Sequence, residues 1–256
     1  MSIDRRRFLE WTGMTAAAGL VRPPIEAGER ASPRYKAVAF DAFTTFDPTP
    51  IGGLAETLFP GRGAQLGQVW RSRQFEYQWL RALAGRYEDF RRTTEDALIF
   101  AARQMRLDLT PEKRDRLMQA YLELTAWPDV PAALSSLKDA GVRLGFVSNM
   151  TTAMLEAGIR NAKLERLFEH VLSTDRVRSY KPDPRAYQMA IDALGVKREQ
   201  ILFVAFAGWD ASGARWFGYP TFWNNRFVLP PEELTATPDA TERDLSGLPR
   251  FVLASN

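Results

Sequence analysis

The sequence of 256 residues contains no cysteine and a single histidine, His170. The absence of cysteine excludes disulfides, thiolate catalysis and cysteine-ligated metals, and one histidine excludes a metal site built from several histidines. Any catalysis therefore has to rest on carboxylates, lysine, arginine and hydroxyl groups. We expect His170 to begin a strand and to have no catalytic role.

The chain also lacks a strong net charge and a long apolar run. Its formal net charge is +3, and lysine and arginine are scattered among carboxylates, so we expect no nucleic-acid partner. No uncharged apolar run approaches the roughly 20 residues that span a bilayer, so we expect no stable membrane association. Hydrophobic residues make up 45% of the chain and charged residues 25%, which is typical of a globular protein with a substantial core.

Residues 1–34 differ in character from the rest of the chain. Residues 5–9 read Arg-Arg-Arg-Phe-Leu, an uncharged stretch covers residues 11–21, and small residues follow near Ala27. A basic segment, an apolar segment and small residues in this order are typical of an export signal, and the paired arginines resemble the twin-arginine type. We therefore predict a periplasmic protein. If the segment is instead a disordered extension, we expect a cytoplasmic one.

The rest of the chain alternates between apolar runs and helical patterns. Strand-like runs occupy residues 36–40, 142–148, 170–173, 201–206 and 219–223, and residues 251–253 are a candidate edge strand. Helical patterns occupy residues 131–140, 151–161 and 184–194. Asp183-Pro184 supplies a cap and a first-turn proline to the last of these helices, and Gly195 closes it. The alternation predicts an α/β fold with a doubly wound parallel sheet.

Residues 51–126 interrupt this alternation because they contain no convincing strand. Helical patterns cover residues 63–84, 88–106 and 111–125. We interpret residues 51–126 as an inserted helical cap domain and residues 35–50 and 127–256 as the α/β core. A pocket is then expected between the cap and the carboxyl ends of the strands. Trp70 and Trp79 are expected in the core, and Glu95 and Asp96 on a solvated helix face.

Polar side chains follow four of the predicted strands. Asp41 ends the first strand, Ser148 and Asn149 close the second, Lys181 lies after the third, and Asp210 follows the fourth. Because the carboxyl ends of parallel strands meet at one edge of a sheet, we expect these side chains to lie close together. Each of them alone is also compatible with a turn, a helix cap or a solvated loop.

These residues lie in motifs that resemble the haloacid dehalogenase-like superfamily and, more narrowly, its type II (S)-2-haloacid dehalogenases. The resemblance covers about residues 35–226. Its motifs here are Phe40-Asp41-Ala42-Phe43-Thr44-Thr45, the segment 70–80 with Trp70-Arg71, residues 94–98, Tyr180-Lys181-Pro182-Asp183-Pro184 and Trp209-Asp210-Ala211-Ser212-Gly213. The set is specific, whereas any single motif is weak. The resemblance implies a Rossmann-like core with a cap, a small 2-haloacid as substrate, no cofactor and a possible homodimer.

The resemblance also implies catalytic roles. Asp41 attacks C2 of the haloacid and forms an ester, which water then hydrolyses to a 2-hydroxy acid. Thr45 orients Asp41 by a hydrogen bond, and Lys181 keeps it ionised. Arg71 receives the departing halide together with an N–H of Asn149.

The remaining site residues bind the substrate or support these groups. By the same resemblance, Ser148 holds the substrate carboxylate, while Tyr187 and Asp210 support Lys181 and the hydrolytic water. The apolar pocket around the substrate tail is formed by Phe43, Phe75, Phe90 and Trp209. Tyr187 is also counted among the substrate-binding residues. Excluding water from such a pocket strengthens its electrostatic contacts.

Several positions distinguish this chain from relatives within the superfamily. Phosphatases carry an aspartate two residues after the nucleophile, as general acid and Mg²⁺ ligand, whereas this chain has Phe43, which can serve neither purpose. We therefore expect no metal. Thr44 replaces the usual glycine, and Ala205 and Ala207 replace polar residues, so ester hydrolysis is the step in doubt. The alternatives are a phosphatase or other hydrolase, and an impaired homologue that only binds small carboxylates.

Overall fold

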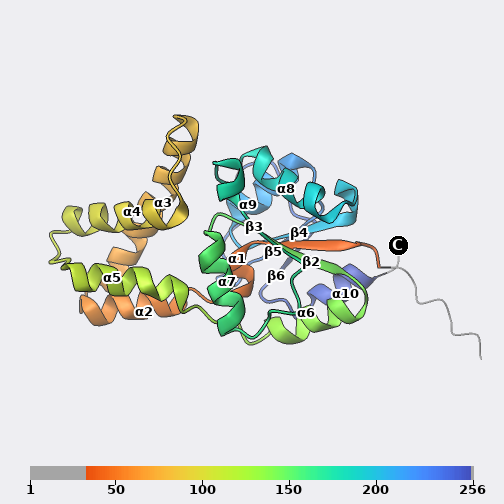
Figure 1. Ribbon diagram of the computed structural model, residues 1–256, viewed down its shortest axis with the longest axis horizontal. Helices are drawn as coiled ribbons and strands as arrows, with labels where there is room; N and C mark the ends of the chain where they lie inside the picture. Colours follow the sequence, from red (N-terminus) through yellow and green to blue (C-terminus); the bar gives the residue numbers. More distant parts are fainter. Residues whose placement is uncertain (1–32, 255–256) are drawn as a thin grey trace, which may run out of the picture. The chain divides into compact units, whose positions relative to one another are not determined.

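A computed structural model describes residues 33–254 of the chain. Within this range the core is one sheet of six parallel strands in the order β3-β2-β1-β4-β5-β6 (Figure 1). The strands are β1 (Ala37–Phe40), β2 (Arg143–Ser148), β3 (His170–Ser173), β4 (Ile201–Ala205), β5 (Thr221–Asn224) and β6 (Ala240–Glu242). The doubly wound parallel sheet is confirmed, and His170 begins β3 as predicted. The predicted export signal falls on residues 1–34, of which 1–32 lie outside the described residues.

Helices cover both faces of this sheet because its central strands are apolar on both sides. All four residues of β1 are fully buried: Val38 and Phe40 belong to the core on one face, and Ala37 and Ala39 to the core on the other. The first face is covered by α6 (Val130–Asp139), α7 (Thr152–Asn161) and α10 (Leu248–Leu253). The second is covered by α8 (Pro184–Leu194) and α9 (Gly208–Phe217).

Helix α8 has the predicted ends. The Asp183 side chain accepts a hydrogen bond from the backbone N–H of Arg185, and Pro184 is the first helical residue. Gly195 ends the helix in the left-handed region with φ of 62°. The side-chain cap satisfies a free N–H of the first turn, and proline in that turn has no N–H to satisfy. The terminal glycine adopts the left-handed conformation that lets the last carbonyl groups be paired. Lys181 therefore lies in a short segment between η2 (Thr174–Val177) and the capped start of α8.

The chain between β1 and β2 is helical, as expected, and most of it stands to one side of the sheet in Figure 1. Its helices are α1 (Ala42–Thr45), α2 (Thr49–Leu58), α3 (Gly63–Leu83), α4 (Phe90–Gln104) and α5 (Pro111–Gln119), with η1 (Ala120–Leu122) before α6. Trp70 is buried between α3 and α4, where its indole N–H donates to the carbonyl of Thr94 at 2.8 Å. None of the helices in residues 33–254 is long and apolar enough to cross a bilayer.

Two predictions about these regions are wrong. Residues 251–253 are not an edge strand but the end of α10, because Pro249 in the first turn and the buried Leu248 and Val252 favour a helix packed on the sheet. The edge strand is β6, whose polar sequence gives no apolar signal and which is held by backbone pairing to β5.

Glu95 and Asp96 are also not simply solvated. Glu95 pairs with Arg114 at 3.2 Å, and Asp96 pairs with Arg81 at 2.6 Å and with Arg92 at 3.1 Å. These carboxylates join α4 to its neighbours α3 and α5.

Candidate active site

Asp41 lies where the order of the sheet reverses. Strand β1 pairs with both β2 and β4, and Asp41 directly follows it, with its backbone N–H donating to Val204 O at 2.9 Å. Ligands of open α/β sheets bind at such switch points. One carboxylate oxygen, Oδ1, accepts a hydrogen bond from the Phe43 N–H at 2.9 Å and caps α1. The second oxygen, Oδ2, is left to face the lysine described next.

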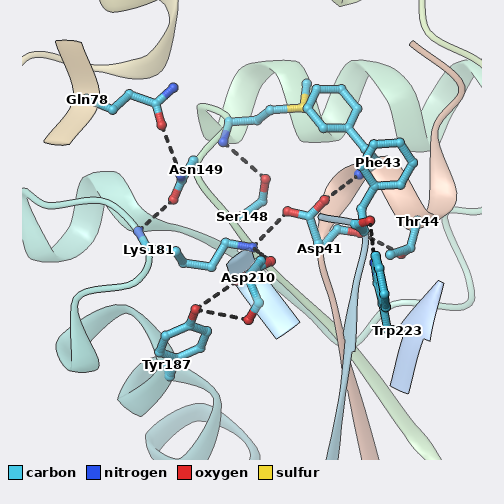
Figure 2. A network of polar contacts seen from close by, with 12 residues as sticks. Asp41, Phe43, Thr44, Gln78, Ser148, Asn149, Lys181, Tyr187, Asp210 and Trp223 are labelled. Atoms are coloured by element: carbon cyan, nitrogen blue, oxygen red, sulfur yellow. Dashed lines mark hydrogen bonds and ion pairs between the residues drawn. The ribbon is translucent and has the colours of Figure 1, made fainter. Parts of the chain in front are cut away.

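Lys181 is fully buried between two carboxylates. Its Nζ lies 2.7 Å from Asp41 Oδ2 and 2.6 Å from Asp210 Oδ2 (Figure 2). Burial lowers the pKa of Lys181, but the charges of Asp210 and Asp41 outweigh it and hold the pKa above its ordinary value. Lys181 is therefore a fixed cation that both carboxylates share.

Asp210 is buried on the far side of this lysine. Burial raises the pKa of Asp210 to about 6, against the opposing effect of Lys181 and with a smaller contribution from the charge of Asp41. The Tyr187 hydroxyl donates to Asp210 Oδ1 at 2.8 Å, which favours the charged form (Figure 2). A carboxylate with this pKa can exchange a proton near neutral pH.

A small pocket of about 30 Å³ adjoins Asp41. It is lined by nine residues of the predicted site: Asp41, Phe43, Arg71, Phe75, Phe90, Ser148, Asn149, Trp209 and Asp210. Gln74, Met150, Phe206 and Ala207 complete the lining, and sequence reasoning did not assign them to it. The predicted convergence of cap and core residues is therefore present in the structure.

Arg71 is the only cationic side chain among the described residues that line this pocket. It comes from α3, and its guanidinium lies over the Phe75 ring at 5.2 Å. Desolvation by the surrounding protein lowers the pKa of Arg71, with Tyr121 and Asp41 acting in the opposite direction. Because arginine starts from a very high pKa, it stays charged and can hold an anion there.

Aromatic rings form the apolar wall of the pocket. Phe43 packs on Phe206 at 5.9 Å, and Phe75 packs edge-to-face on Trp209 at 5.4 Å. Trp79 is only partly buried: it packs on Trp209 at 5.6 Å, and its indole N–H donates to the Lys181 carbonyl at 3.2 Å. Trp79, predicted in the core, is instead half-buried, at a contact between the cap and the α/β core.

Asn149 joins the cap to the lysine segment. Its Oδ1 accepts a hydrogen bond from the Lys181 N–H at 2.9 Å, and its Nδ2 donates to Gln78 Oε1 at 3.0 Å (Figure 2). An amide nitrogen carries two N–H donors, so one remains for a ligand in the pocket. Ser148 Oγ accepts from the Met150 N–H at 3.1 Å, and its own hydroxyl hydrogen can be donated to a carboxylate.

Two predicted contacts differ in detail. Among residues 33–254 the buried Thr45 hydroxyl has no hydrogen-bond partner, so the predicted hydrogen bond to Asp41 is not present there. The turn of α1 instead brings Thr44 back to residue 41, where its hydroxyl donates to the Asp41 carbonyl at 2.6 Å. Tyr187, predicted to bind substrate, is fully buried behind Asp210, hydrogen-bonds to that carboxylate and is not among the described residues that line the pocket.

The carboxylates of this site are paired with a cationic side chain, Lys181, and a second cation, Arg71, lines the pocket. Among residues 33–254, no three carboxylate or imidazole side chains are grouped so that they could hold a metal ion. The position two residues after Asp41 is the ring of Phe43, which packs on another ring. The arrangement can therefore hold an ionised nucleophile beside an arginine that accepts an anion.

Comparisons with known proteins agree with this site. A family model for haloacid dehalogenase-like hydrolases matches residues 34–218. The (S)-2-haloacid dehalogenase of Pseudomonas sp. (strain YL) is 45% identical over 205 residues, which cover 80% of this chain and 88% of that protein. Haloacetate dehalogenase H-2 of Moraxella sp. (strain B) is 40% identical over 209 residues, which cover 81% and 93%.

Solved structures give the same result. A crystal structure of an L-2-haloacid dehalogenase matches with a TM-score of 0.84 and 44% identity, covering 86% of this chain and 99% of that one. The L-2-haloacid dehalogenase of Xanthobacter autotrophicus with chloropropionic acid covalently bound matches with a TM-score of 0.79 and 34% identity, covering 87% and 100%. The chain thus belongs to the (S)-2-haloacid dehalogenases of the haloacid dehalogenase-like hydrolase family.

Proposed function

We propose that this protein hydrolyses the carbon–halogen bond of (S)-2-haloacids without a metal ion, giving a 2-hydroxy acid and a halide. The observation that carries the proposal is the position of Lys181, whose Nζ lies 2.7 Å from Asp41 and 2.6 Å from Asp210. An ammonium group in this place pairs with the Asp41 carboxylate and orients it beside the pocket.

In the first step Asp41 acts as a nucleophile. A carboxylate oxygen attacks C2 from the side opposite the halogen, the carbon–halogen bond breaks, and the halide leaves with the electron pair. C2 is inverted and becomes linked to Asp41 as an ester. Arg71, the cation in the pocket lining, receives the halide, and Ser148 with the free N–H of Asn149 holds the substrate carboxylate.

In the second step Asp210 acts as a base. It lines the same pocket, and its pKa of about 6 lets it accept a proton from water near neutral pH. The water oxygen attacks the carbonyl carbon of the ester, and the bond between that carbon and the substrate oxygen breaks. The departing oxygen takes the proton from Asp210 and the 2-hydroxy acid leaves. The second proton of the water is released to solvent, so that Asp41 is again a carboxylate.

Halide release from (S)-2-chloropropionate, compared with its (R) enantiomer and measured with and without EDTA, tests the proposal. We expect release from the (S) form only, unchanged by EDTA. Phosphate release from phosphoesters, abolished by EDTA, would favour a phosphatase instead. Binding of 2-chloropropionate without halide release would favour a carboxylate-binding homologue.

A labelling experiment tests the ester itself. Excess enzyme that turns over once in H₂¹⁸O is expected to carry the label in the Asp41 side chain, because water attacks the carbonyl carbon of the enzyme ester. Mass spectrometry of the peptide that contains residue 41 measures this. Label found only in the 2-hydroxy acid would contradict an aspartyl ester.

The rate is expected to fall on the acidic side with a midpoint near the Asp210 pKa of about 6, since protonated Asp210 cannot accept a proton from water. Acid unfolding does not explain this fall. The folded pKa lies above its ordinary value, so this group's contribution to stability is present at low pH and is lost as pH rises toward about 6.

The Tyr187→Phe variant provides the control for this pH dependence. It removes a hydrogen bond that favours the charged carboxylate, so the midpoint should move to higher pH. Initial rates across the pH range measure the midpoint, and circular dichroism follows the fold. An unmoved midpoint would exclude Asp210 as the titrating group.

We also propose export and self-association. The arginine pair at residues 5 and 6 supports export through the twin-arginine route. Replacing both with lysine should move the protein from the periplasmic to the cytoplasmic fraction, whereas a cytoplasmic location of the unaltered chain would exclude export.

A homodimer is the expected assembly, and light scattering of the purified protein measures it.

A further inference from the structure

A much larger cavity opens beside the catalytic pocket. It encloses about 820 Å³, against about 30 Å³ next to Asp41. The two share lining residues, among them Phe43, Arg71, Phe75 and Ala207. The smaller space holds about two water-sized groups, fewer than the heavy atoms of a 2-haloacid, so part of the ligand has to extend into the larger space.

The far walls of this cavity are mostly apolar. Helix α2 contributes Ile51 and Ala55, and the core contributes Phe206, Phe227 and Leu229. Phe227 and Leu229 remain 51% and 55% exposed, which leaves apolar surface available to a ligand.

The wall formed by the core segment is held in place by hydrogen bonds. Asn225 Nδ2 donates to the Leu229 carbonyl at 2.8 Å, and its Oδ1 accepts from the Leu229 N–H at 2.9 Å. The adjacent Arg226 pairs with Asp129 at 2.9 Å and donates to the Thr44 carbonyl at 2.9 Å. These hydrogen bonds and the ion pair hold the segment 225–229 in place, and with it the apolar side chains that line the cavity.

The two spaces meet at residues that line both of them, and these residues differ in charge and in size. Under the proposed function, Ser148 and Asn149 hold the carboxylate of a haloacid and Asp41 faces its C2, all on the pocket side. Ala207, with only a methyl group, stands on both sides of the junction. A tail attached to C2 is thus directed past Ala207 into the apolar cavity.

We propose that the preferred substrates are 2-haloacids whose tail is several carbons long or carries an aromatic ring, and that the tail lies in this cavity. The inference rests on the proposed function and names its substrate class. Each methylene moved from water into an apolar site is expected to raise kcat/KM about threefold.

The first test compares 2-bromopropanoate with 2-bromohexanoate. Three additional methylenes predict a kcat/KM about 30-fold higher for the longer acid. Initial rates of bromide release measure the ratio. Equal values for the two acids, or a higher value for the shorter one, would overturn the inference.

The second test fills the cavity. Gly52 lines it and Gly53 does not, although both lie on α2 and a Cβ at either meets nothing within 4 Å. Phenylalanine is also a better helix former than glycine, so both variants should fold. Gly52→Phe should lower kcat/KM for 2-bromohexanoate at least about tenfold and leave 2-bromopropanoate within about twofold. Gly53→Phe should change neither, and an equal effect of both substitutions would contradict the proposal.

Binding of unreactive acids separates this inference from the proposed function. Calorimetry should show hexanoate binding more tightly than propanoate, and Gly52→Phe should remove the difference. That result supports the cavity as a tail site even if no haloacid is turned over, which would contradict the proposed function alone. Equal binding of the two acids would contradict the tail site even if halide is released.

Discussion

Replacing Asp41 by asparagine is expected to reduce halide release by at least about 10⁴-fold, because a neutral amide cannot displace halide from carbon. The fold should survive, since the amide oxygen can still accept the hydrogen bond that Asp41 Oδ1 receives from the Phe43 N–H. Lys181 also keeps Asp210 as a partner at 2.6 Å. Initial rates and thermal unfolding of the same preparation measure the two effects.

Asp47 offers a matched control for this substitution. Its Oδ1 accepts a hydrogen bond from the Thr49 N–H at 2.8 Å, so it caps a turn as Asp41 does, but it is not among the residues lining the pocket. Asp47→Asn should leave halide release within about twofold. Full activity of Asp41→Asn, with asparagine at residue 41 verified by mass spectrometry, would exclude Asp41 as the nucleophile.

Lys181→Met is expected to lower both stability and activity severely. It leaves Asp41 and the fully buried Asp210 facing each other without a cation. Removing one partner from a buried ion pair costs about 3–5 kcal/mol of unfolding free energy, and the loss of an ionised, oriented nucleophile should cost at least about 10³-fold in rate. Urea unfolding near neutral pH measures the first effect and bromide release the second.

The cause of that instability can be tested separately from a loss of packing. The buried Asp210 carboxylate of Lys181→Met, left without its cation, should take up a proton as the pH falls, so part of the lost stability should return at acidic pH. Adding Asp210→Asn should restore stability near neutral pH for the same reason. Lys138→Met, at an exposed lysine of α6, should change stability by less than about 0.5 kcal/mol. Equal destabilisation at both pH values would indicate packing instead of charge.

The sequence was sufficient to predict the central part of the site. Strand β1 is buried on both faces, and the runs that became β2 and β4 are buried almost throughout, so continuous apolar runs marked them without ambiguity. Because β1 and β4 are parallel neighbours, Asp41 and Asp210 come to the same edge of the sheet. Lys181 follows β3, which β2 separates from β1, so its distances of 2.7 and 2.6 Å to the two carboxylates depend on the segment after β3 as well as on the strand order.

The errors arose where tertiary contacts decide the outcome. Thr44 and Thr45 are chemically equivalent, and only the turn of α1 determines which hydroxyl reaches Asp41. Strand β6 depends on pairing with β5, which local sequence does not reveal. Phe206 read as a departure from a polar motif, yet its contact with Phe43 makes it a wall of the pocket.

Arg226 has a consequence for how much of the chain the reaction needs. It lies beyond residue 218, where the family match ends, and it holds the carbonyl of Thr44 in the short helix that Asp41 caps. A protein shortened to residue 218 would keep every residue assigned to the chemistry but would lose the hydrogen bond from Arg226 to the turn that follows Asp41. The region that the family model matches therefore lacks a residue that supports the turn of the nucleophile.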